Sequence, residues 1–337
     1  MLKDKTILIT GGTGSLGKAL TAHIFNYHSN IKKLIIFSRD EQKQFQMAQE
    51  FSENQFPKIR YFLGDVRDEQ RLIRAFQGVD IVIHAAAMKH VHLAEYNPDE
   101  CIKTNIFGAQ NVIHAALQTT VSKVVALSTD KACAPINLYG ATKLTSDKLF
   151  VAANNIRGTN PIKFSVVRYG NVMGSNGSVI PFFIKKRKEG KLPITDAAMT
   201  RFNISLKGGV DMVMHAIEHA WGGEIFIPKI PSYRITDVAT AVAPNCEQVI
   251  TGIRPGEKIH EEMITVSDSF YTYDLGKYFT ILPSVPIFDI NEYTSKNSTK
   301  KVNEGFSYDS GTNTEWETVE SLRDLIKEHV DESFSID

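Results

Sequence analysis

The sequence predicts an α/β protein, a doubly wound parallel sheet with a smaller α+β lobe after it. Short apolar runs alternate with segments long enough for helices up to about residue 173. The runs are apolar throughout, as in parallel strands that helices cover on both faces. The first run is followed at once by a glycine-rich turn and a helical segment, which is how such a domain begins.

Six apolar runs are interpreted as the strands of this sheet. They are residues 5–10, 32–40, 59–66, 79–87, 121–129 and 162–172. The segments between them are long enough for helices, among them residues 41–52, 68–76 and 97–117. This alternation is typical of a parallel sheet whose connections cross its two faces.

The pattern changes after Asn171, where glycine, proline and a basic run (185–191) interrupt it. We expect residues 1–173 to form the first domain, with some later segments returning to it. Residues 174–283 are expected to form the smaller lobe, and residues 284–337 an irregular arm that ends in a docked helix. That helix is predicted because apolar residues recur on one helical face. They are Val319, Leu322, Leu325, Ile326 and Val330.

The composition disfavours several classes of function. Lys+Arg and Asp+Glu number 38 each in 337 residues, so the chain lacks the basic excess of a nucleic-acid-binding protein. The longest apolar stretches, about eight residues, are too short for a membrane span. The amino terminus runs into a strand without a secretion signal, and the three widely spaced cysteines, Cys101, Cys133 and Cys246, are typical of the cytoplasm. His90 and His92 alternate without a carboxylate partner, so no metal site is predicted.

Gly11, Gly14 and Gly17 form a Gly-x-x-Gly-x-x-Gly turn between the first strand and the first helix. Glycines allow a tight turn and let a pyrophosphate approach the backbone, while the helix N-terminus stabilises its negative charge. Strand, turn and helix occur in the order of a Rossmann-type dinucleotide site, which is what we predict here. The other residues placed in this loop are Thr13, Ser15 and Leu16.

The end of the second strand, Ser38-Arg39-Asp40, bears on the choice between the two nicotinamide dinucleotides. An acidic residue at this tip would bind the ribose hydroxyls of NAD, whereas Arg39 suits the 2′-phosphate of NADP. Asp40 comes one position later and leaves NAD open, but NADP is favoured. Asp65 ends the third strand and is expected to accept a hydrogen bond from adenine. Further cofactor contacts are predicted at Lys43, Val66, Ala85, Ala86, Ala87, Lys89, Asn105 and Val172.

Tyr139 and Lys143 are four residues apart in a segment expected to open a helix after the fifth strand. This spacing puts both side chains on one face. A tyrosine phenol is a poor base at its ordinary pKa near 10, and a neighbouring ammonium with a cationic nicotinamide ring would lower that value. The pair therefore favours a nicotinamide enzyme, with Lys143 also holding the nicotinamide ribose. Asp130 and Lys131 stand side by side a few residues earlier.

Together these motifs resemble the extended short-chain dehydrogenase/reductases. The resemblance rests on GGTGSLG (11–17), HAAA (84–87), Asn105, LST (127–129) and the Tyr139/Lys143 pair. Thr129-Asp130-Lys131 stands where retaining nucleotide-sugar 4,6-dehydratases carry Thr-Asp-Glu. With SRDE, GDVRD, AAMKHV, VVRYGNVMGS and IRPGEKIHE, it is similar to the inverting UDP-N-acetylglucosamine 4,6-dehydratases. INLYGATK resembles their pseudaminic acid branch, since the capsule branch typically has Met in place of Tyr139; flagellin glycosylation follows from this resemblance alone.

The resemblance implies a reaction that explains the Asp-Lys pair. H5 of the sugar becomes acidic only after C4 is oxidised, so a hydride passes from C4 to tightly bound NADP⁺ while Tyr139 takes the hydroxyl proton. Asp130 then protonates the departing O6, Lys131 removes H5, and the hydride returns to C6. Reprotonation on the opposite face inverts C5, with Tyr139 as a candidate donor. Thr129 is expected to bind the substrate or its O4. A neutral Lys131 requires a strongly lowered pKa, which Lys143 and the nicotinamide ring are expected to supply.

The predicted substrate is UDP-N-acetylglucosamine, and the product is UDP-2-acetamido-2,6-dideoxy-β-L-arabino-hexos-4-ulose. A UDP-sugar needs cations for its pyrophosphate and amide or backbone groups for uracil. By resemblance Arg254 meets the phosphates and Glu257 the uridine ribose, while residues 177–183 line the cleft and residues 192–195 flank the uracil. The other predicted substrate contacts are Lys89, Asn171, Ser178, Val179, Ile180, Pro181, Thr195 and Arg201.

Other functions stay open from the residues themselves. A UDP-hexose 4-epimerase needs Tyr139, Lys143 and a Ser or Thr, and a C5-retaining dehydratase is a further alternative. A non-catalytic NADP sensor is disfavoured, because sensors of this fold usually lose the Tyr or the Lys. Relatives form dimers and hexamers, so the resemblance implies a homo-oligomer that associates through helices of the first domain.

Overall fold

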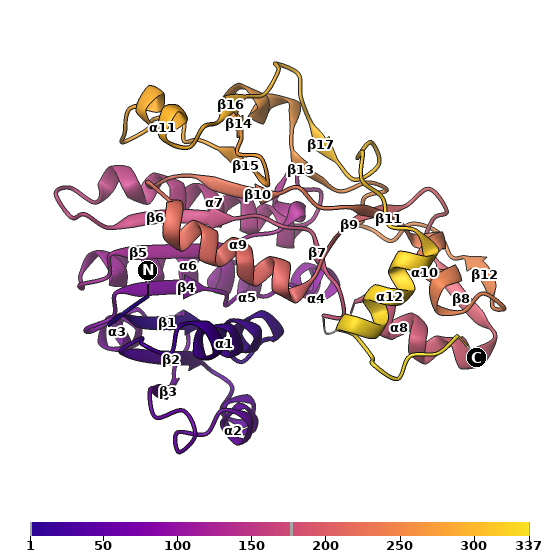
Figure 1. Ribbon diagram of the computed structural model, residues 1–337, viewed down its shortest axis with the longest axis horizontal. Helices are drawn as coiled ribbons and strands as arrows, with labels where there is room; N and C mark the ends of the chain where they lie inside the picture. Colours follow the sequence, from indigo (N-terminus) through magenta and orange to yellow (C-terminus); the bar gives the residue numbers. More distant parts are fainter. Residues whose placement is uncertain (1, 176–177, 337) are drawn as a thin grey trace.

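The computed structural model describes residues 2–175 and 178–336, and its largest feature is a ten-stranded sheet (Figure 1). Its parallel strands are β1 (Thr6–Thr10), β2 (Lys33–Ser38), β3 (Ile59–Leu63), β4 (Ile81–His84), β5 (Lys123–Leu127), β6 (Lys163–Val167) and β10 (Ile225–Pro228). They run in the order β3-β2-β1-β4-β5-β6-β10, which is a doubly wound order with one strand added. Beyond β10 the sheet continues antiparallel through β15 (Tyr278–Ile281), β14 (Thr272–Asp274) and β16 (Lys300–Lys301).

Helices cover both faces of this sheet, which explains why its strands are apolar throughout. The helices are α1 (Ser15–Tyr27), α2 (Glu41–Glu50), α3 (Glu69–Ala75), α6 (Gly108–Leu117), α7 (Leu138–Ile156) and α9 (Leu206–His219). Two short helices, α4 (Val91–Tyr96) and α5 (Pro98–Ile102), pack against α7. In β1, Ile7 and Ile9 belong to the core that includes Leu20 of α1. Leu8 faces the other way, into the core that includes Phe150 of α7.

A group of shorter elements lies at one end of the large sheet (Figure 1). Its strands are β7 (Asn171–Val172), β8 (Lys191–Ile194), β9 (Thr200–Ile204), β11 (Ser232–Arg234), β12 (Glu247–Ile250), β13 (Glu262–Ile264) and β17 (Tyr308–Asp309). Its helices are α8 (Val179–Lys186), α10 (Ile235–Val242) and α12 (Val319–His329). These three helices share a core that includes Phe183 of α8, Val238 of α10 and Leu322 of α12. The last helix therefore docks through the apolar face that its periodicity predicts.

The predicted fold class is confirmed, and three segments differ in detail. The strand expected at 162–172 is divided into β6 and β7, which belong to different sheets; between them Gly170 packs where a Cβ would lie 2.5 Å from Phe202 Cβ. The helix expected at 97–117 is interrupted by a π-helical turn (Lys103–Phe107) between α5 and α6. The arm expected at 284–337 contains, before its last helix, α11 (Ile290–Lys296), which Asp289 caps and Tyr293 anchors by burial.

Later segments join the large sheet and its covering helices. Residues 174–283 contribute α9, β10, β14 and β15 to this layer, and residues 284–337 contribute β16. The division of the chain at residue 173 stays a prediction. Within residues 2–175 and 178–336, no helix has both the length and the apolar character needed to cross a membrane.

Candidate active site

The glycine turn between β1 and α1 has the geometry of a phosphate-binding loop. Gly11 has φ +64°, and a Cβ there would lie 2.8 Å from the Ala86 backbone. At Gly17 a Cβ would lie 2.3 Å from the Gly12 carbonyl oxygen, so this glycine lets α1 approach the turn. Gly14 caps α1 without a side chain, and the first turn of the helix contains no acidic residue. The residues present therefore fit a phosphate group at this helix N-terminus.

The tip of β2 is polar and its side chains are held in place. Ser38 Oγ lies 3.1 Å from Thr13 Oγ1. Arg39 is exposed, with Nη1 3.6 Å from Asp65 Oδ2. Asp40 caps α2 by accepting from the Lys43 backbone N–H at 2.9 Å, which directs its carboxylate toward the helix. The cation therefore remains at the surface of the strand tip while the acid is used in capping.

Asp65 is paired with cations of the protein. Its Oδ2 lies 2.7 Å from Arg67 Nη2, and its Oδ1 accepts from the Arg67 backbone N–H at 3.0 Å. Partial burial would raise the pKa of Asp65, but the bonds and charge of Arg67 and the charge of Arg39 hold it below its usual value. The neighbouring Val66 is buried in the core. Contact of either residue with adenine stays a prediction.

Asn105 supports the loop that follows β4. In the π-helical turn, its Oδ1 accepts from Met88 N at 2.8 Å and its Nδ2 donates to Met88 O at 2.9 Å. Nδ2 also donates to Thr142 Oγ1 of α7 at 3.0 Å. These bonds tie the loop with Ala85, Ala86, Ala87 and the exposed Lys89 to α7. A direct contact between Asn105 and a cofactor stays a prediction.

Tyr139 and Lys143 lie one turn apart near the start of α7, and both are buried. Burial raises the pKa of Tyr139 to about 12, while the charge of Lys131 and a hydrogen bond with Thr129 act to lower it. Burial lowers the pKa of Lys143, and Asp147 one turn further on opposes that shift. In the protein by itself, burial outweighs the expected lowering of the Tyr139 pKa, and the nearby cation that acts on the phenol is Lys131 rather than Lys143.

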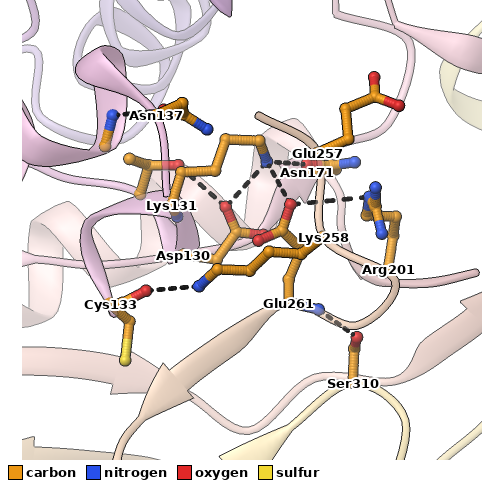
Figure 2. Close-up of polar contacts among 12 residues, drawn as sticks. Asp130, Lys131, Cys133, Asn137, Asn171, Arg201, Glu257, Lys258, Glu261 and Ser310 are labelled. Carbon is orange, nitrogen blue, oxygen red and sulfur yellow. Dashed lines mark hydrogen bonds and ion pairs between the residues drawn. The ribbon is translucent and has the colours of Figure 1, made fainter. Parts of the chain in front are cut away.

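The ammonium of Lys131, in the turn after β5, is surrounded by side-chain oxygen atoms from three segments of the chain (Figure 2). Lys131 Nζ lies 3.1 Å from Asp130 Oδ1, 3.2 Å from Asn171 Oδ1 and 3.2 Å from Glu261 Oε1. Arg201 Nε lies 3.7 Å from the same Glu261 oxygen. These five residues are called the Lys131 cluster below. They come from four segments of the chain that are distant in sequence.

The electrostatic environment of Lys131 differs from the one that the sequence predicts. Burial by itself would lower the pKa of Lys131, but the carboxylates of Asp130 and Glu261 outweigh it and raise the pKa above its ordinary value. The prediction that proximity to Lys143 lowers this pKa is wrong. Besides Asp130, the charged group that lies next to Lys131 is the carboxylate of Glu261, which raises the pKa. A Cβ on Gly140 would lie 2.1 Å from the Lys131 carbonyl oxygen, so Tyr139 and Lys131 are held together by a glycine contact.

The predicted substrate residues fall into two groups. Asn171 belongs to the Lys131 cluster and lines a small pocket with Ser178, Val179, Ile180 and Tyr233. Ser178 Oγ is buried without a hydrogen-bond partner among the described residues. Pro181 lies in α8, and Thr195 directly follows β8. Gly177, at the start of the predicted cleft segment, lies outside the described residues.

The loop with Arg254 and Glu257 is fastened to the turn after β5. Lys258 Nζ donates to the Cys133 carbonyl at 2.7 Å (Figure 2). Asn137 Nδ2 donates to the Gly256 carbonyl at 2.8 Å. Arg254 and Glu257 pair with each other at 2.6 Å. Their contacts with phosphates and ribose stay predictions. Sequence reasoning missed Glu261, Lys258 and Asn137, although IRPGEKIHE contains the first two.

The fold and the Tyr139/Lys143 arrangement define a member of the short-chain dehydrogenase/reductase class. Residues 7–283 match the sequence model of the family described as polysaccharide biosynthesis protein. The chain is 57% identical over 333 residues to the UDP-N-acetylglucosamine 4,6-dehydratase (inverting) of Campylobacter jejuni, covering 97% of this chain and 98% of that one. The chain therefore belongs to the polysaccharide biosynthesis protein family. The resemblance to the inverting UDP-N-acetylglucosamine 4,6-dehydratases is confirmed.

Two further relatives place the chain within the family. The UDP-glucose 4-epimerase of Rickettsia canadensis is 44% identical over 289 residues, covering 83% of this chain and 84% of that one. The X-ray structure of Pen from Bacillus thuringiensis has a TM-score of 0.88 at 38% identity, covering 97% of this chain and 98% of that one. The fold thus extends through the C-terminal residues, beyond the segment that the family model matches.

Proposed function

We propose that the protein is a UDP-N-acetylglucosamine 4,6-dehydratase that inverts C5, a hydro-lyase with tightly bound and recycled NADP. The observation that carries the proposal is the position of Lys131, in the active-site turn beside Asp130 and Tyr139. A 4-epimerase does not need this lysine. The 57% identity to a chain named for this activity supports it.

The cofactor would be held by the glycine turn and by the tip of β2. The N-terminus of α1 would bind the pyrophosphate, and the exposed Arg39 suits a 2′-phosphate. When bound, the nicotinamide ring would supply a reversible hydride acceptor for the oxidation at C4 and the return of hydride to C6. Lys143, whose pKa burial lowers, lies one turn from Tyr139 and would hold the nicotinamide ribose.

Tyr139 takes the proton of the C4 hydroxyl. Burial raises its pKa to about 12, so the phenolate depends on the Lys131 charge and on the Thr129 hydrogen bond, both of which lower it. The ketone formed at C4 makes H5 acidic. Thr129 Oγ1 also lies 2.9 Å from Asp130 Oδ1, so its single proton is donated either to this carboxylate or to the phenolate, and the hydroxyl links the oxidation and elimination groups.

The elimination removes H5 and O6 together. Lys131 takes the proton from C5, the electron pair of the C5–H bond forms the C5–C6 double bond, and O6 leaves as water with a proton from Asp130. The carboxylates around Lys131 favour its ammonium form. One proton must therefore move from Lys131 to Asp130 before the elimination, giving a neutral amine and a carboxylic acid with no change in total charge. Reprotonation of C5 on the opposite face completes the inversion.

The test is NMR of the purified protein with UDP-N-acetylglucosamine in D₂O. A C6 methyl signal, deuterium at C5 and the couplings of an L-arabino 4-keto sugar are expected. Formation without added NADP⁺ would indicate that the cofactor copurifies. A methyl signal with retained C5 configuration, or a C4 epimer as the sole product, contradicts the proposal.

The 4-epimerase is the second candidate, because a 44% identical relative carries that name and Tyr139, Lys143 and Thr129 would suffice for it. Lys131→Ala separates the two. It should abolish methyl formation by a dehydratase and spare the C4 epimerisation of an epimerase. Lys148→Ala, at an exposed position on the same helix as Lys143, is the matched control and should leave either activity unchanged.

The cellular setting is also proposed. Cys101, Cys133 and Cys246 are free thiols, which fits a reducing cytoplasm. Synthesis of a pseudaminic acid type sugar, for which this reaction would be the first step, follows from the motif INLYGATK. Self-association as a dimer or hexamer stays a prediction.

A further inference from the structure

Glu261 is a buried acid at the active-site end of β13, and its backbone is fixed. The residue is 2% exposed. Its N–H donates to Ser310 Oγ at 2.9 Å, and its carbonyl accepts from Ser310 N at 2.8 Å. Figure 2 shows its side chain directed away from Ser310 and toward Lys131. The position of the carboxylate is therefore set by the pairing of this segment with the C-terminal arm.

The two oxygens of this carboxylate have different environments. Oε1 lies 3.2 Å from Lys131 Nζ and 3.7 Å from Arg201 Nε. Oε2 is buried and has no hydrogen-bond partner among residues 2–175 and 178–336. The same holds for Oδ2 of Asp130, on the other side of Lys131. A buried, unpaired carboxylate oxygen costs stability, so two of them around one lysine point to a use other than stability.

The charges that face Lys131 come from every element packed around it. Asp130 is on its own turn, Glu261 precedes β13, Arg201 is on β9, Tyr139 is on α7 and Tyr233 is on β11. The two acids balance Lys131 and Arg201, so the group is neutral as a whole. Glu261 contacts two of the cations and is the acid to which the proposed reaction assigns no proton transfer.

We propose that Glu261 is a positioning residue of the dehydration: its carboxylate orients Lys131 Nζ against Asp130 and stabilises the ammonium that forms when Lys131 takes H5. The inference rests on the proposed function for the reaction that Lys131 performs. Glu261 acts through Lys131 and does not need to touch the sugar. Its role therefore predicts a change in the rate and pH dependence of turnover rather than in substrate binding.

The first test is the pH profile of Glu261→Gln, which keeps the shape of the side chain and removes its charge. The alkaline limb, where the rate falls as the Asp130–Lys131 pair loses its proton to solvent, should move to lower pH by about one unit or more, because a negative charge that favours the ammonium is gone. The plateau kcat should fall about 10- to 100-fold, as expected for the loss of a hydrogen bond between charged groups, with KM nearly unchanged. A profile that coincides with the wild type, or a loss confined to KM, overturns the proposal.

Glu262→Gln is the matched control. Glu262 is the next residue and is part-buried on β13. It lies opposite Asp309 in the backbone register of the antiparallel β13–β17 pair. Its substitution should leave the pH limb in place. If the Glu261→Gln protein does not fold, Glu261→Asp replaces it, since the shorter side chain withdraws the carboxylate from Lys131. The limb should again move to lower pH, and an unmoved limb overturns the proposal.

The second test does not depend on turnover. In protein labelled with ¹⁵N-lysine, the Nζ signal of Lys131 is identified by its loss in Lys131→Arg. This signal should report an ammonium up to a higher pH in the wild type than in Glu261→Gln. The same titration in both proteins overturns the proposal. A wild type that makes no 4-keto-6-deoxy sugar would instead contradict the proposed function, and the NMR titration would still decide the role of Glu261 toward Lys131.

Discussion

Two buried ionic groups lie near the ends of β5 and β6, and they differ in how their carboxylates are paired. In the first, the Asp147 cluster (Ser128, Asp147 and Arg168), Asp147 Oδ2 accepts from Ser128 Oγ at 2.7 Å and from Arg168 Nη2 at 3.2 Å. Arg168 also donates to the Met263 carbonyl at 3.0 Å. The cluster joins the ends of β5 and β6 to α7 and β13. Its Ser128 is two residues before Asp130 in the chain.

The Lys131 cluster has the same kind of groups but leaves two acid oxygens without partners. Asp130 Oδ2 and Glu261 Oε2 are buried and unpaired among the described residues, whereas the buried unpaired atom of the Asp147 cluster is Arg168 Nε and not a carboxylate oxygen. The cation is a lysine with a 22% exposed side chain in one cluster and an arginine with a 4% exposed side chain in the other. Arginine stays protonated, while lysine can lose its proton. The comparison suggests that the Asp147 cluster serves stability and the Lys131 cluster serves proton transfer.

The largest expected effect is on the Asp147 cluster. Asp147→Ala leaves the buried Arg168 guanidinium without its counter-charge, and should lower the free energy of unfolding by about 3–5 kcal/mol. Chemical denaturation of wild type and variant measures it. Glu189→Ala, which breaks the exposed Lys186–Glu189 pair, is the control and should cost about 0–1 kcal/mol. A cost no larger than the control would mean that the Asp147 cluster does not hold these elements together.

The next effect is on the Lys131 cluster and should appear in activity. Asp130→Asn keeps the shape of the side chain but cannot donate an acidic proton to O6. Product formation should fall about 100-fold, which corresponds to about 2.7 kcal/mol in the activation barrier. Denaturation should show a change well below that of Asp147→Ala. If Asp130→Asn instead destabilised the protein and kept its kcat, the assigned contrast between the two clusters would be reversed.

His84 extends the comparison to pH, because it is a second buried ionisable group that packs against α7. Its Nδ1 lies 2.8 Å from Thr10 Oγ1, and its ring centroid lies 5.5 Å from that of Phe150. Burial, with a smaller contribution from the Lys143 charge, lowers the pKa of His84 to about 3. Between pH 6.5 and that value the unfolded chain binds a proton that the folded chain does not. Stability contributed by the neutral imidazole is therefore lost as the pH falls.

This loss can be measured by comparing wild type with His84→Gln. From pH 7 to pH 5 the wild type should lose about 2 kcal/mol more of its free energy of unfolding than the variant does. Glutamine can still bond to Thr10 but does not titrate. Equal slopes in the two proteins would show that His84 is not kept neutral by its surroundings.

The comparison also shows how far the sequence could predict the site. Thr129, Asp130, Lys131, Tyr139 and Lys143 fall within 15 residues, so one strand end and one helix start bring them together and local patterns suffice to find them. The glycine turn and the parallel strands depend on similarly local rules. Each of the six predicted runs contains one of the observed parallel strands, although the runs extend beyond the strand ends.

The missed features depend on contacts between distant segments. Glu261 reaches Lys131 because Ser310 of the C-terminal arm fixes the segment before β13, and no spacing in the sequence indicates this. The direction of the Lys131 pKa shift was mistaken for the same reason, since adjacent residues suggested Lys143 as the neighbour and the fold supplied a carboxylate. The pairing of Asp147 with Arg168 joins a helix to a strand in the same way.

The smallest predicted effect concerns Ser128, which is the neutral member of the Asp147 cluster. Ser128→Ala removes the hydroxyl that donates to Asp147 Oδ2 at 2.7 Å but leaves Arg168 in place. The free energy of unfolding should fall by about 1.5 kcal/mol, the lower end for a hydrogen bond to a charged group, because the carboxylate keeps its main partner. Activity per folded molecule should not change, since the bond joins Ser128 to Asp147 and neither residue belongs to the Lys131 cluster. Thermal denaturation and initial rates on the same samples measure both. A fall in kcat with unchanged stability would mean that the two clusters are coupled through the end of β5, and that the division between them suggested here is too sharp.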